Sequence, residues 1–427
     1  MSVTTPAGRV IRLRGGGAGR PAAAAADSMP TRPGLLDRPL TSYYLVLGIT
    51  MLLLALGLVM VLSTTSAAAL DSGGSPYAGF QKQLVGVAIG LPLMWLAARS
   101  SPAVFRAAAY PLMAVSVIGL LLAITIGVTA DGVARWVQLG PFQLQPSEFA
   151  KLAFVLWGAD LLARKEKLGQ LTDWRQLLIP LMPGAAVLCL LVLLGDDLGT
   201  TFLLLVIFLA LLWVIGTPGR LFIGMLALMG FVMIILIIVE PYRLERITGF
   251  LNPQAQSSAA YQPTEGKYAL GSGGLFGVGL GASREKWGWL PESTSDMIFA
   301  IIGEELGLVG TLCVTALYGG LAYAGLRVAR RVTDPFSRLL AAAITTWIVV
   351  QAAVNIGGVI GVLPITGVPL PLVSQGLSSA LVTMVGLGML MSFARREPGA
   401  SQALAARGHF SGDRALSWLR QGTRRGT

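Results

Sequence analysis

Long apolar runs separated by short polar segments follow one another along most of the chain. A helix needs roughly 20 mostly apolar residues to cross about 30 Å of bilayer hydrocarbon, and ten runs approach that length. They occupy residues 43–63, 83–98, 105–128, 147–163, 177–194, 198–216, 221–239, 297–326, 339–363 and 374–394. This pattern predicts an all-α polytopic membrane protein with about ten transmembrane helices.

Two of the predicted spans are interrupted by polar residues. The fourth is short and contains Lys151 and Asp160, and residues 197–199 break the apolar pattern between the fifth and the sixth. The composition nevertheless indicates a membrane protein. The chain is 54% apolar and 12% charged, with a mean hydropathy of +0.70, whereas a soluble domain carries about 25% charged residues.

Lysine and arginine are unevenly distributed between the two sets of predicted loops. With ten spans both termini lie on one side, and 24 of the 32 basic residues fall in the tails and loops of that side. Because cytoplasmic loops carry the excess of basic residues, both termini are predicted to be cytoplasmic. The large loop at residues 240–296, between the seventh and eighth spans, is then extracytoplasmic. Topology and anionic lipid account for the net charge of +11, which argues against nucleic-acid binding.

The chain divides into three predicted parts. Residues 1–42, rich in Gly, Ala, Arg and Pro, form a disordered basic cytoplasmic tail. Residues 43–394 form the ten-helix transmembrane domain, and residues 395–427 form a second basic cytoplasmic tail. The sequence shows no convincing internal repeat, so it gives no indication of the duplicated halves common in transporters.

The residue types on the predicted outer side limit the chemistry available there. Cys189 and Cys313 lie within spans, and the single histidine, His409, lies in the C-terminal tail. Histidine-based catalysis and histidine-ligated zinc are therefore excluded on the outer face. Asp296 ends the outer loop at the start of the eighth span, where burial would raise its pKa toward that of a general base. The alternative is that Ser295 or Asp296 caps this helix.

Basic side chains of the same loop are candidates for binding a diphosphate. They are Arg243, Arg246, Arg284 and Lys286. Arginine holds phosphate oxygens through two parallel hydrogen bonds, and lysine acts as a point charge. From spacing alone it is equally open that these cations pair with Glu240, Glu245 and Glu285 or contact lipid headgroups.

Ionisable side chains also occur inside two predicted spans. Glu148 and Lys151 are three residues apart and therefore neighbours on one helical face. Such a pair within a membrane marks either a functional site or a structural ion pair. Glu304 and Glu305 lie roughly 12 Å from Asp296 along a helix that rises about 1.5 Å per residue, and for these two a structural role is favoured.

Two uncharged outer segments are rich in glycine. Residues 271–281 contain a pattern like G-x-G-x-x-G. Because no strand or βαβ unit frames it, a tight loop that allows close backbone approach is favoured over a nucleotide site. Residues 361–379 combine Pro and Gly without any charge, which predicts a re-entrant or broken segment covered by protein.

Several of these segments resemble the SEDS family of bacterial peptidoglycan glycosyltransferases, which includes the division protein FtsW and the elongation protein RodA. The resemblance covers roughly residues 43–395 in family order. The matching stretches are R-W-V-Q-L-G at 135–140, Q-P-S-E-F-A-K at 145–151, D-L-G-T-T at 197–201, P-Y-R-L-E-R-I-T-G-F-L-N-P at 241–253, Y-Q at 261–262, G-S-G-G-L-F-G-V-G-L-G-A-S-R-E-K-W at 271–287, L-P-E-S-T-S-D-M-I-F-A-I-I-G-E-E-L-G at 290–307 and N-I-G-G-V-I-G-V-L-P-I-T-G-V-P-L-P-L-V-S at 355–374. Departures from the family's usual residues occur at Asp131, Gly195, Asp196, Thr294, Met297, Gln375 and Leu377.

The resemblance implies an inverting glycosyl transfer on the outer face of the cytoplasmic membrane. The family polymerises lipid II: the 4-hydroxyl of one disaccharide attacks the anomeric carbon of the growing chain, and undecaprenyl diphosphate leaves. Asp296 matches the family's proposed catalytic aspartate, which favours a general base over a helix cap. The substrate-binding residues implied with it are Arg135, Glu148, Lys151, Arg243, Arg246, Gln262, Arg284, Lys286 and Ser374.

The K-W-G-W-L-P-E run and the Arg- and Ala-rich tails resemble the division branch, FtsW, of actinobacteria. This implies septal cell-wall synthesis with a class B penicillin-binding protein and other membrane proteins of the divisome as partners. No metal site is predicted, although a divalent cation, Mg²⁺ or Mn²⁺, is left open. The alternatives are an elongation-type, RodA-like polymerase, a flippase or transporter of lipid II, and an inactive scaffold that recruits the transpeptidase. Ionisable residues gathered at the outer boundary favour surface chemistry over transport.

Overall fold

The computed structural model describes residues 40–71, 75–130, 133–140, 142–169, 174–252 and 258–400. Most of the two predicted tails, together with Asp131 and His409, lies outside these residues. The elements of the described part are α1 (Thr41–Asp71), α2 (Ala78–Arg99), α3 (Pro102–Ile126), β1 (Val128–Ala130), β2 (Val133–Leu139), β3 (Phe142–Leu144), α4 (Pro146–Lys167), α5 (Trp174–Leu194), α6 (Leu198–Val214), α7 (Gly219–Val239), α8 (Pro241–Leu251), α9 (Ser258–Ser272), α10 (Ile298–Arg331), α11 (Pro335–Val359) and α12 (Leu377–Ala394).

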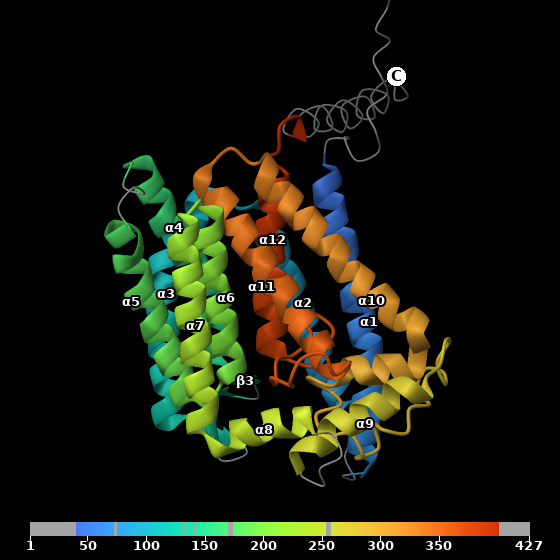
Figure 1. Ribbon diagram of the computed structural model, residues 1–427. Coiled ribbons are helices and arrows are strands. Elements are labelled where there is room, and N and C mark those ends of the chain that lie inside the picture. Colours follow the sequence, from blue (N-terminus) through green and yellow to red (C-terminus); the bar gives the residue numbers. More distant parts are fainter. Residues whose placement is uncertain are drawn as a thin grey trace, which may run out of the picture. The chain divides into compact units, whose positions relative to one another are not determined.

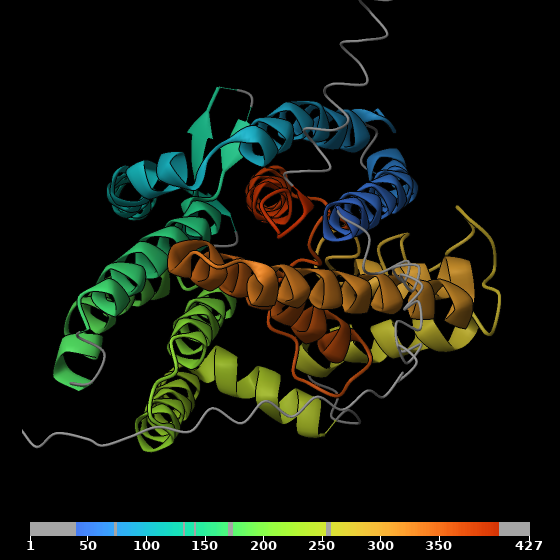
Figure 2. The ribbon, with the colours of Figure 1, turned by 90° about the horizontal axis from the view of Figure 1, so that it is seen from above.

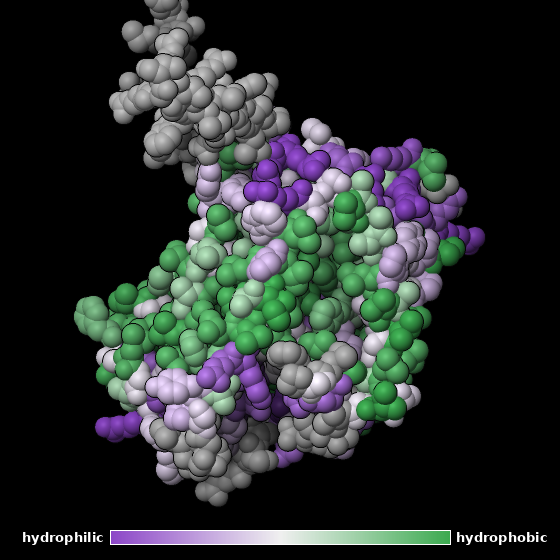
Figure 3. Space-filling view, turned by 180° about the vertical axis from the view of Figure 1, so that it is seen from behind, coloured by the Kyte–Doolittle hydropathy of each residue, from purple (hydrophilic) through white to green (hydrophobic). Residues whose placement is uncertain are grey.

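Each of the ten predicted apolar runs coincides for most of its length with one helix. Eight helices of the described part are long and apolar enough to cross a membrane, namely α1, α2, α3, α5, α7, α10, α11 and α12. α6 is apolar but only 17 residues long, and α4 carries Glu148, Lys151 and Asp160 among its buried residues. Figure 3 shows the apolar surface as a band between two polar zones. These features confirm an all-helical, multi-pass membrane protein.

The helices differ in how much of their surface is covered by the rest of the protein. In the most apolar 18-residue stretch of α12, 83% is buried, whereas in the corresponding stretch of α7 the buried share is 0%. Figure 2 shows α12 enclosed by its neighbours, and Figure 1 shows α7 at the edge of the helix bundle. The polar face of α4 is tolerated because it packs against α3, α6 and α11 and not against lipid.

A small antiparallel sheet with strand order β1-β2-β3 stands outside the helices. Val137 of β2 pairs with Leu144 of β3, and Gly140 adopts a φ of 60° where the chain leaves β2. The V-A-R-W-V-Q-L sequence of β2 is rich in β-branched and aromatic residues, which favour a strand. The sheet places Arg135 and the start of α4 on the same side as α8.

In the loop at residues 240–296, the described residues form two helices, α8 and α9, that the apolar runs did not predict. Pro241 occupies the first turn of α8, where its missing N–H has no cost. Tyr242, Leu244 and Leu251 of α8 are exposed, and Figure 1 shows this helix lying across the ends of the spanning helices. Short amphipathic helices in this orientation are typical of a membrane interface.

The glycine-rich loop closely approaches the backbone of α10, as predicted. α10 is kinked at Gly307, which has φ 68° and ψ −165°. A methyl group added at Gly277 would lie 2.1 Å from the carbonyl oxygen of Glu305, a separation that no side chain tolerates. Residues 361–376, between α11 and α12, are irregular and largely covered, with Val373 fully buried. This agrees with the predicted broken segment.

Candidate active site

Asp296 lies in the turn that leads into α10, and only 8% of its surface is exposed. The N-cap position of α10 is occupied by Met297, which makes no side-chain capping bond. The Ser295 hydroxyl donates to the Glu292 carboxylate. The alternative in which Ser295 or Asp296 serves as the helix cap is therefore not what the structure shows.

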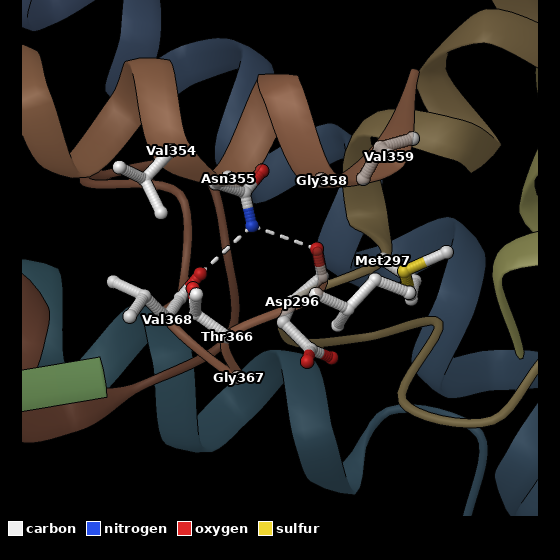
Figure 4. Close-up of a pocket in the computed structure, with 10 residues that line it drawn as sticks. Asp296, Met297, Val354, Asn355, Gly358, Val359, Thr366, Gly367 and Val368 are labelled. Atoms are coloured by element: carbon white, nitrogen blue, oxygen red, sulfur yellow. Dashed lines mark hydrogen bonds between the residues drawn. The ribbon is translucent and has the colours of Figure 1, made fainter. Parts of the chain in front are cut away.

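The backbone of this turn is fixed by donors from the other side of the site. The carbonyls of residues 294–296 accept, in order, from the Gln375 backbone N–H at 3.0 Å, the Ser374 hydroxyl at 2.5 Å and the Asn355 side-chain amide at 2.7 Å. Figure 4 shows the Asn355 amide reaching toward the Asp296 carbonyl while the Asp296 carboxylate points away. Hydrogen bonds thus fix three successive peptide groups, and this restricts the position of the Asp296 carboxylate.

The segment that carries Ser374 is held in turn by buried polar side chains. Asn355 also donates to the Val368 carbonyl at 2.8 Å, and Gln351 donates to the Pro369 carbonyl at 2.9 Å. The Tyr318 hydroxyl of α10 donates to the carbonyl of residue 371 at 2.5 Å. Irregular backbone inside a membrane protein needs such partners, because no bulk water is available to satisfy it.

A small cavity lies between the Asp296 turn, α11 and residues 365–368 (Figure 4). Its volume available to the centre of a water molecule is about 10 Å³, enough for about one water and too little for a sugar. Gly367, with φ 71°, borders it. A methyl group added there would lie 3.9 Å from Arg246 Nη1 and 4.0 Å from Asp296 Oδ2. The carboxylate and the guanidinium therefore face the same space beside Gly367.

The surroundings of Asp296 shift its acidity toward neutral pH. Burial raises the pKa of Asp296 from 3.8 to about 7, and the negative charge of Glu292 adds to the rise. The Arg246 charge, a hydrogen bond from the residue's own N–H and the Ser295 hydroxyl lower the pKa and offset part of that rise. A general base works best when its pKa lies near the operating pH, and Asp296 meets that condition.

A pH profile tests this assignment. If Asp296 is a general base, the kcat/KM of the catalysed reaction is expected to rise with pH and level off above about 7, because only the ionised Asp296 accepts a proton. Removing a neighbouring negative charge in Glu292→Gln lowers the pKa of Asp296 and should move the midpoint to lower pH. An unshifted midpoint, or one close to that of an exposed aspartate, would contradict the assignment. The measurement is the initial rate of the catalysed reaction across the pH range.

Two of the predicted substrate-binding arginines are engaged at the junction of α5 and α6. Arg135 donates to the carbonyls of Gly195 at 2.9 Å and Asp196 at 2.8 Å. Arg243 forms an ion pair with the Asp196 carboxylate and donates to the carbonyl of Leu236 at 3.1 Å. Arg243 thus pairs with a carboxylate 47 residues away in sequence, one that local spacing did not identify.

Lys286 is buried, with 4% of its surface exposed. Its ammonium group donates to Ser63 Oγ at 2.9 Å, the Gly281 carbonyl at 2.7 Å and Glu305 Oε1 at 2.9 Å. These three bonds use every N–H of the ammonium, so Lys286 ties the outer loop to α1 and α10. Glu304 accepts from the Ser283 hydroxyl and from the backbone N–H of residue 284, which is the structural role favoured for the two glutamates.

Three further candidates, Arg246, Arg284 and Gln262, lie in the segment between α7 and α10. Arg246 stacks on the Tyr242 ring at 4.7 Å and is the cation that faces Asp296. Arg284 has an exposed side chain. Gln262 of α9 donates to the carbonyl of residue 291 at 3.3 Å, which ties α9 to the loop that carries Asp296.

Glu148 and Lys151 form an ion pair of 2.7 Å inside the bundle, and Lys151 is fully buried. Lys151 also donates to Gln351 Oε1 at 3.1 Å, and Gln351 reaches residue 369 as described. Through Gln351 of α11, the ion pair therefore connects to residue 369, in the segment that carries Ser374. Sequence reasoning missed Gln351 and Asn355, although two amides four residues apart in an apolar span are a detectable signal.

The fold and this site define a class: a polytopic membrane protein with one buried carboxylate at the end of a spanning helix and an arginine beside it. Residues 43–398 match the model of the cell cycle protein family of FtsW, RodA and SpoVE. The chain belongs to this family.

Two relatives illustrate the match. The chain is 42% identical over 374 residues to the "Probable peptidoglycan glycosyltransferase FtsW" of Mycobacterium tuberculosis, covering 87% of this chain and 71% of that protein. It is 34% identical over 352 residues to the stage V sporulation protein E of Bacillus subtilis, covering 81% and 95% respectively.

Solved structures agree with this fold. A chain from a peptidoglycan synthase complex that coordinates polymerization and crosslinking superposes with a TM-score of 0.67 at 26% identity, covering 82% of this chain and 97% of that one. The rod shape determining protein RodA of Thermus thermophilus superposes with a TM-score of 0.61 at 27% identity, covering 83% and 97%.

Proposed function

We propose that this protein is a peptidoglycan glycosyltransferase that polymerises lipid II into glycan strands on the outer face of the cytoplasmic membrane. Family membership and the 42% identity to a probable FtsW support the activity. The main structural support for the chemistry is the environment of Asp296. Its carboxylate is buried and has a pKa of about 7, and hydrogen bonds to three successive carbonyls fix the turn on which it lies. The distribution of basic residues supports its outward orientation.

One carboxylate is sufficient for the proposed reaction. Asp296 removes the proton from the 4-hydroxyl of one lipid II disaccharide while that oxygen forms a bond to the anomeric carbon of the growing chain. The bond from this carbon to the diphosphate oxygen breaks, and undecaprenyl diphosphate leaves with the electron pair. Direct displacement inverts the anomeric carbon and needs one base on the nucleophile, unlike the two carboxylates of a retaining glycosidase.

The diphosphate leaving group requires positive charge near Asp296. Arg246 faces the same space as the carboxylate, so it is the first candidate to hold a phosphate oxygen. Arg284 is an exposed cation of the same loop. The donors of Lys286 are used within the protein, which makes its part in substrate binding an indirect one.

A divalent cation fits this site only together with the substrate. Among the described residues there is no group of three or more Asp, Glu, His or Cys side chains placed to hold a metal. Mg²⁺ is often bound by one or two carboxylates plus substrate phosphates, and Glu292 lies near enough to Asp296 to raise its pKa. A bound cation would neutralise charge on the leaving diphosphate. Parallel assays with Mg²⁺, Mn²⁺ and chelator test this requirement.

Purified full-length protein in lipid nanodiscs, supplied with lipid II, tests the proposed activity directly. Formation of glycan strands, resolved by gel electrophoresis, is the expected result. The flippase alternative is measured in parallel with fluorescent lipid II in reconstituted vesicles. Translocation without polymerisation would replace the proposal with transport.

An arginine substitution tests the leaving-group contact. We expect Arg246→Gln to lower kcat/KM by about 10–100-fold, the effect of losing one charge-assisted hydrogen bond to a diphosphate. It should also raise the pKa of Asp296 and shift the pH midpoint upward, because Arg246 lowers that pKa. Arg220→Gln, at an exposed residue at the start of α7, is the matched control. Wild-type kinetics and an unmoved midpoint would remove Arg246 from the site.

We infer that the protein acts in septal synthesis with a class B penicillin-binding protein. The 42% identity to an FtsW supports the division branch, and the likeness to a chain of a peptidoglycan synthase complex supports a transpeptidase partner. Polymerisation measured with and without the purified transpeptidase tests this. A chain with no activity under either condition would act as a scaffold.

A further inference from the structure

The glycine-rich loop has an exposed surface that is almost entirely apolar. No charged residue occurs between Lys267 and Arg284. Within this stretch the exposed fractions are 62% for Leu275, 80% for Phe276 and 61% for Leu280. Soluble surfaces rarely gather side chains of this kind without a partner.

The backbone of the loop pairs with the kink of α10. Leu308 N–H donates to the Gly274 carbonyl at 2.9 Å, and Val309 N–H donates to the Leu275 carbonyl at 3.2 Å. In the other direction, N–H groups of residues 278–279 donate to the carbonyls of residues 304–305 at 2.9 and 3.1 Å. The loop thus binds backbone groups that a kinked helix leaves without helical partners. In a lipid environment, backbone N–H and C=O groups outside regular helices need hydrogen-bond partners within the protein.

The apolar side chains of the loop continue the lipid-facing surface of α10. Leu308, Val309 and Leu312 are exposed by 49%, 56% and 59%, and they lie within the candidate span Ile298–Arg331. Because residues 308–309 are hydrogen-bonded to residues 274–275, the loop and this surface are adjacent. Figure 1 shows the loop as the yellow trace beside the start of α10. The same side is at the left of Figure 3, where the apolar band reaches the edge of the molecule.

Polar groups are confined to the base of the loop. Lys286 is paired with Glu305 and Ser63, and Ser283 is bound to Glu304. Trp287 and Trp289 follow and are exposed. Aromatic residues of this kind are enriched where hydrocarbon meets headgroups. Along the chain, the apolar tip is followed by paired charges and then by tryptophans, the order expected of a segment that leaves the hydrocarbon toward the headgroups.

We propose that residues 273–281 are inserted among the acyl chains of the outer leaflet beside the kinked start of α10. Residues 298–306 of α10 connect this loop to the Asp296 turn, so insertion fixes the depth of Asp296 relative to the membrane surface. The occupant of this apolar surface is lipid, and the proposal does not depend on the glycosyl transfer itself.

Photo-crosslinking of the wild-type protein tests the contact without any substitution. The full chain is reconstituted into phosphatidylglycerol–phosphatidylethanolamine vesicles that contain a phospholipid with a diazirine at the end of one acyl chain. Mass spectrometry is expected to find adducts on residues 275–280 as well as on residues 308–312 of the lipid-facing span. Adducts on residues 308–312 without adducts on the loop would overturn the proposal.

Cysteine labelling provides an independent measurement. In a Cys189→Ala, Cys313→Ala background, Phe276→Cys and Leu280→Cys are expected to be protected from a membrane-impermeant maleimide, and the same protection is expected for Val309→Cys on the lipid-facing span. Gln138→Cys, at an exposed position of β2, is the reactive control. Labelling of Phe276→Cys at the rate of Gln138→Cys would overturn insertion. Labelling that is blocked only when a transpeptidase is added would identify the surface as a protein interface and also overturn it.

Discussion

Asp296→Asn is expected to lower the rate of lipid II polymerisation by about 10²–10⁴-fold, the contribution of a general base. The amide keeps the shape of the carboxyl but cannot accept the proton of the 4-hydroxyl. The bonds that position the turn use the backbone carbonyls of residues 294–296, so they remain available. The loss should therefore appear in kcat, with little change in the amount of folded protein.

Stability measurements separate this loss from misfolding. A carboxyl whose pKa rises from 3.8 to about 7 on folding binds its proton more tightly in the folded state. The free energy of unfolding therefore falls as pH increases through that window. Above pH 7 the wild type carries a buried charge that the Asn variant lacks. The variant should therefore be as stable as the wild type or more stable, and the gain in the free energy of unfolding should not exceed about 4 kcal/mol.

The matched control for this substitution is Glu245→Gln, which makes the same chemical change at an exposed residue of the same outer loop. It should polymerise lipid II at the wild-type rate. Wild-type polymerisation by Asp296→Asn would reject Asp296 as the base, whatever the stability of the variant. A variant that loses both activity and folded protein would point to a structural role.

The helices were largely predictable from the sequence because each span must carry about 20 apolar residues. The position of Asp296 at the end of a span followed from the same pattern. The amphipathic helix α8 was not predictable from apolar runs, since 11 residues with two arginines form no such run. The sheet at residues 128–144 was missed for the same reason.

The partners of the charged residues depend on contacts between distant segments. Arg243 pairs with Asp196, and Lys286 pairs with Glu305 and Ser63. Spacing along one helix reveals neighbours three or four residues apart, which is why the Glu148–Lys151 pair was found and these were not. Folding alone decides which carboxylate lies opposite a given cation.

The departures from the family pattern also become interpretable in the structure. Gln375 contributes its backbone N–H to the carbonyl of Thr294, a bond that any residue except proline can make. Leu377 packs against Gly86 of α2, where an added methyl group would lie 2.7 Å from its Cδ1. These substitutions therefore leave the support of the Asp296 turn in place, because that support comes from the backbone and from Asn355 and Ser374.

Lys151→Met is expected to destabilise the protein by about 3–5 kcal/mol, because it leaves the buried Glu148 carboxylate without its cation. The ion pair is enclosed by α4 and α11, and the lysine lies 5.5 Å from the Trp347 ring. The measurement is the fraction of protein that remains monodisperse after heating, as determined by size-exclusion chromatography.

The double variant Glu148→Gln, Lys151→Met distinguishes a structural pair from a substrate-binding one. Removing both charges takes away the unpaired carboxylate, so the double variant should recover much of the lost stability. If the pair acts only by holding Gln351 and the segment behind Asp296, polymerisation recovers in parallel with stability. Recovered stability with activity still absent would assign Lys151 to the substrate, and a stable Lys151→Met single variant would contradict the ion pair itself.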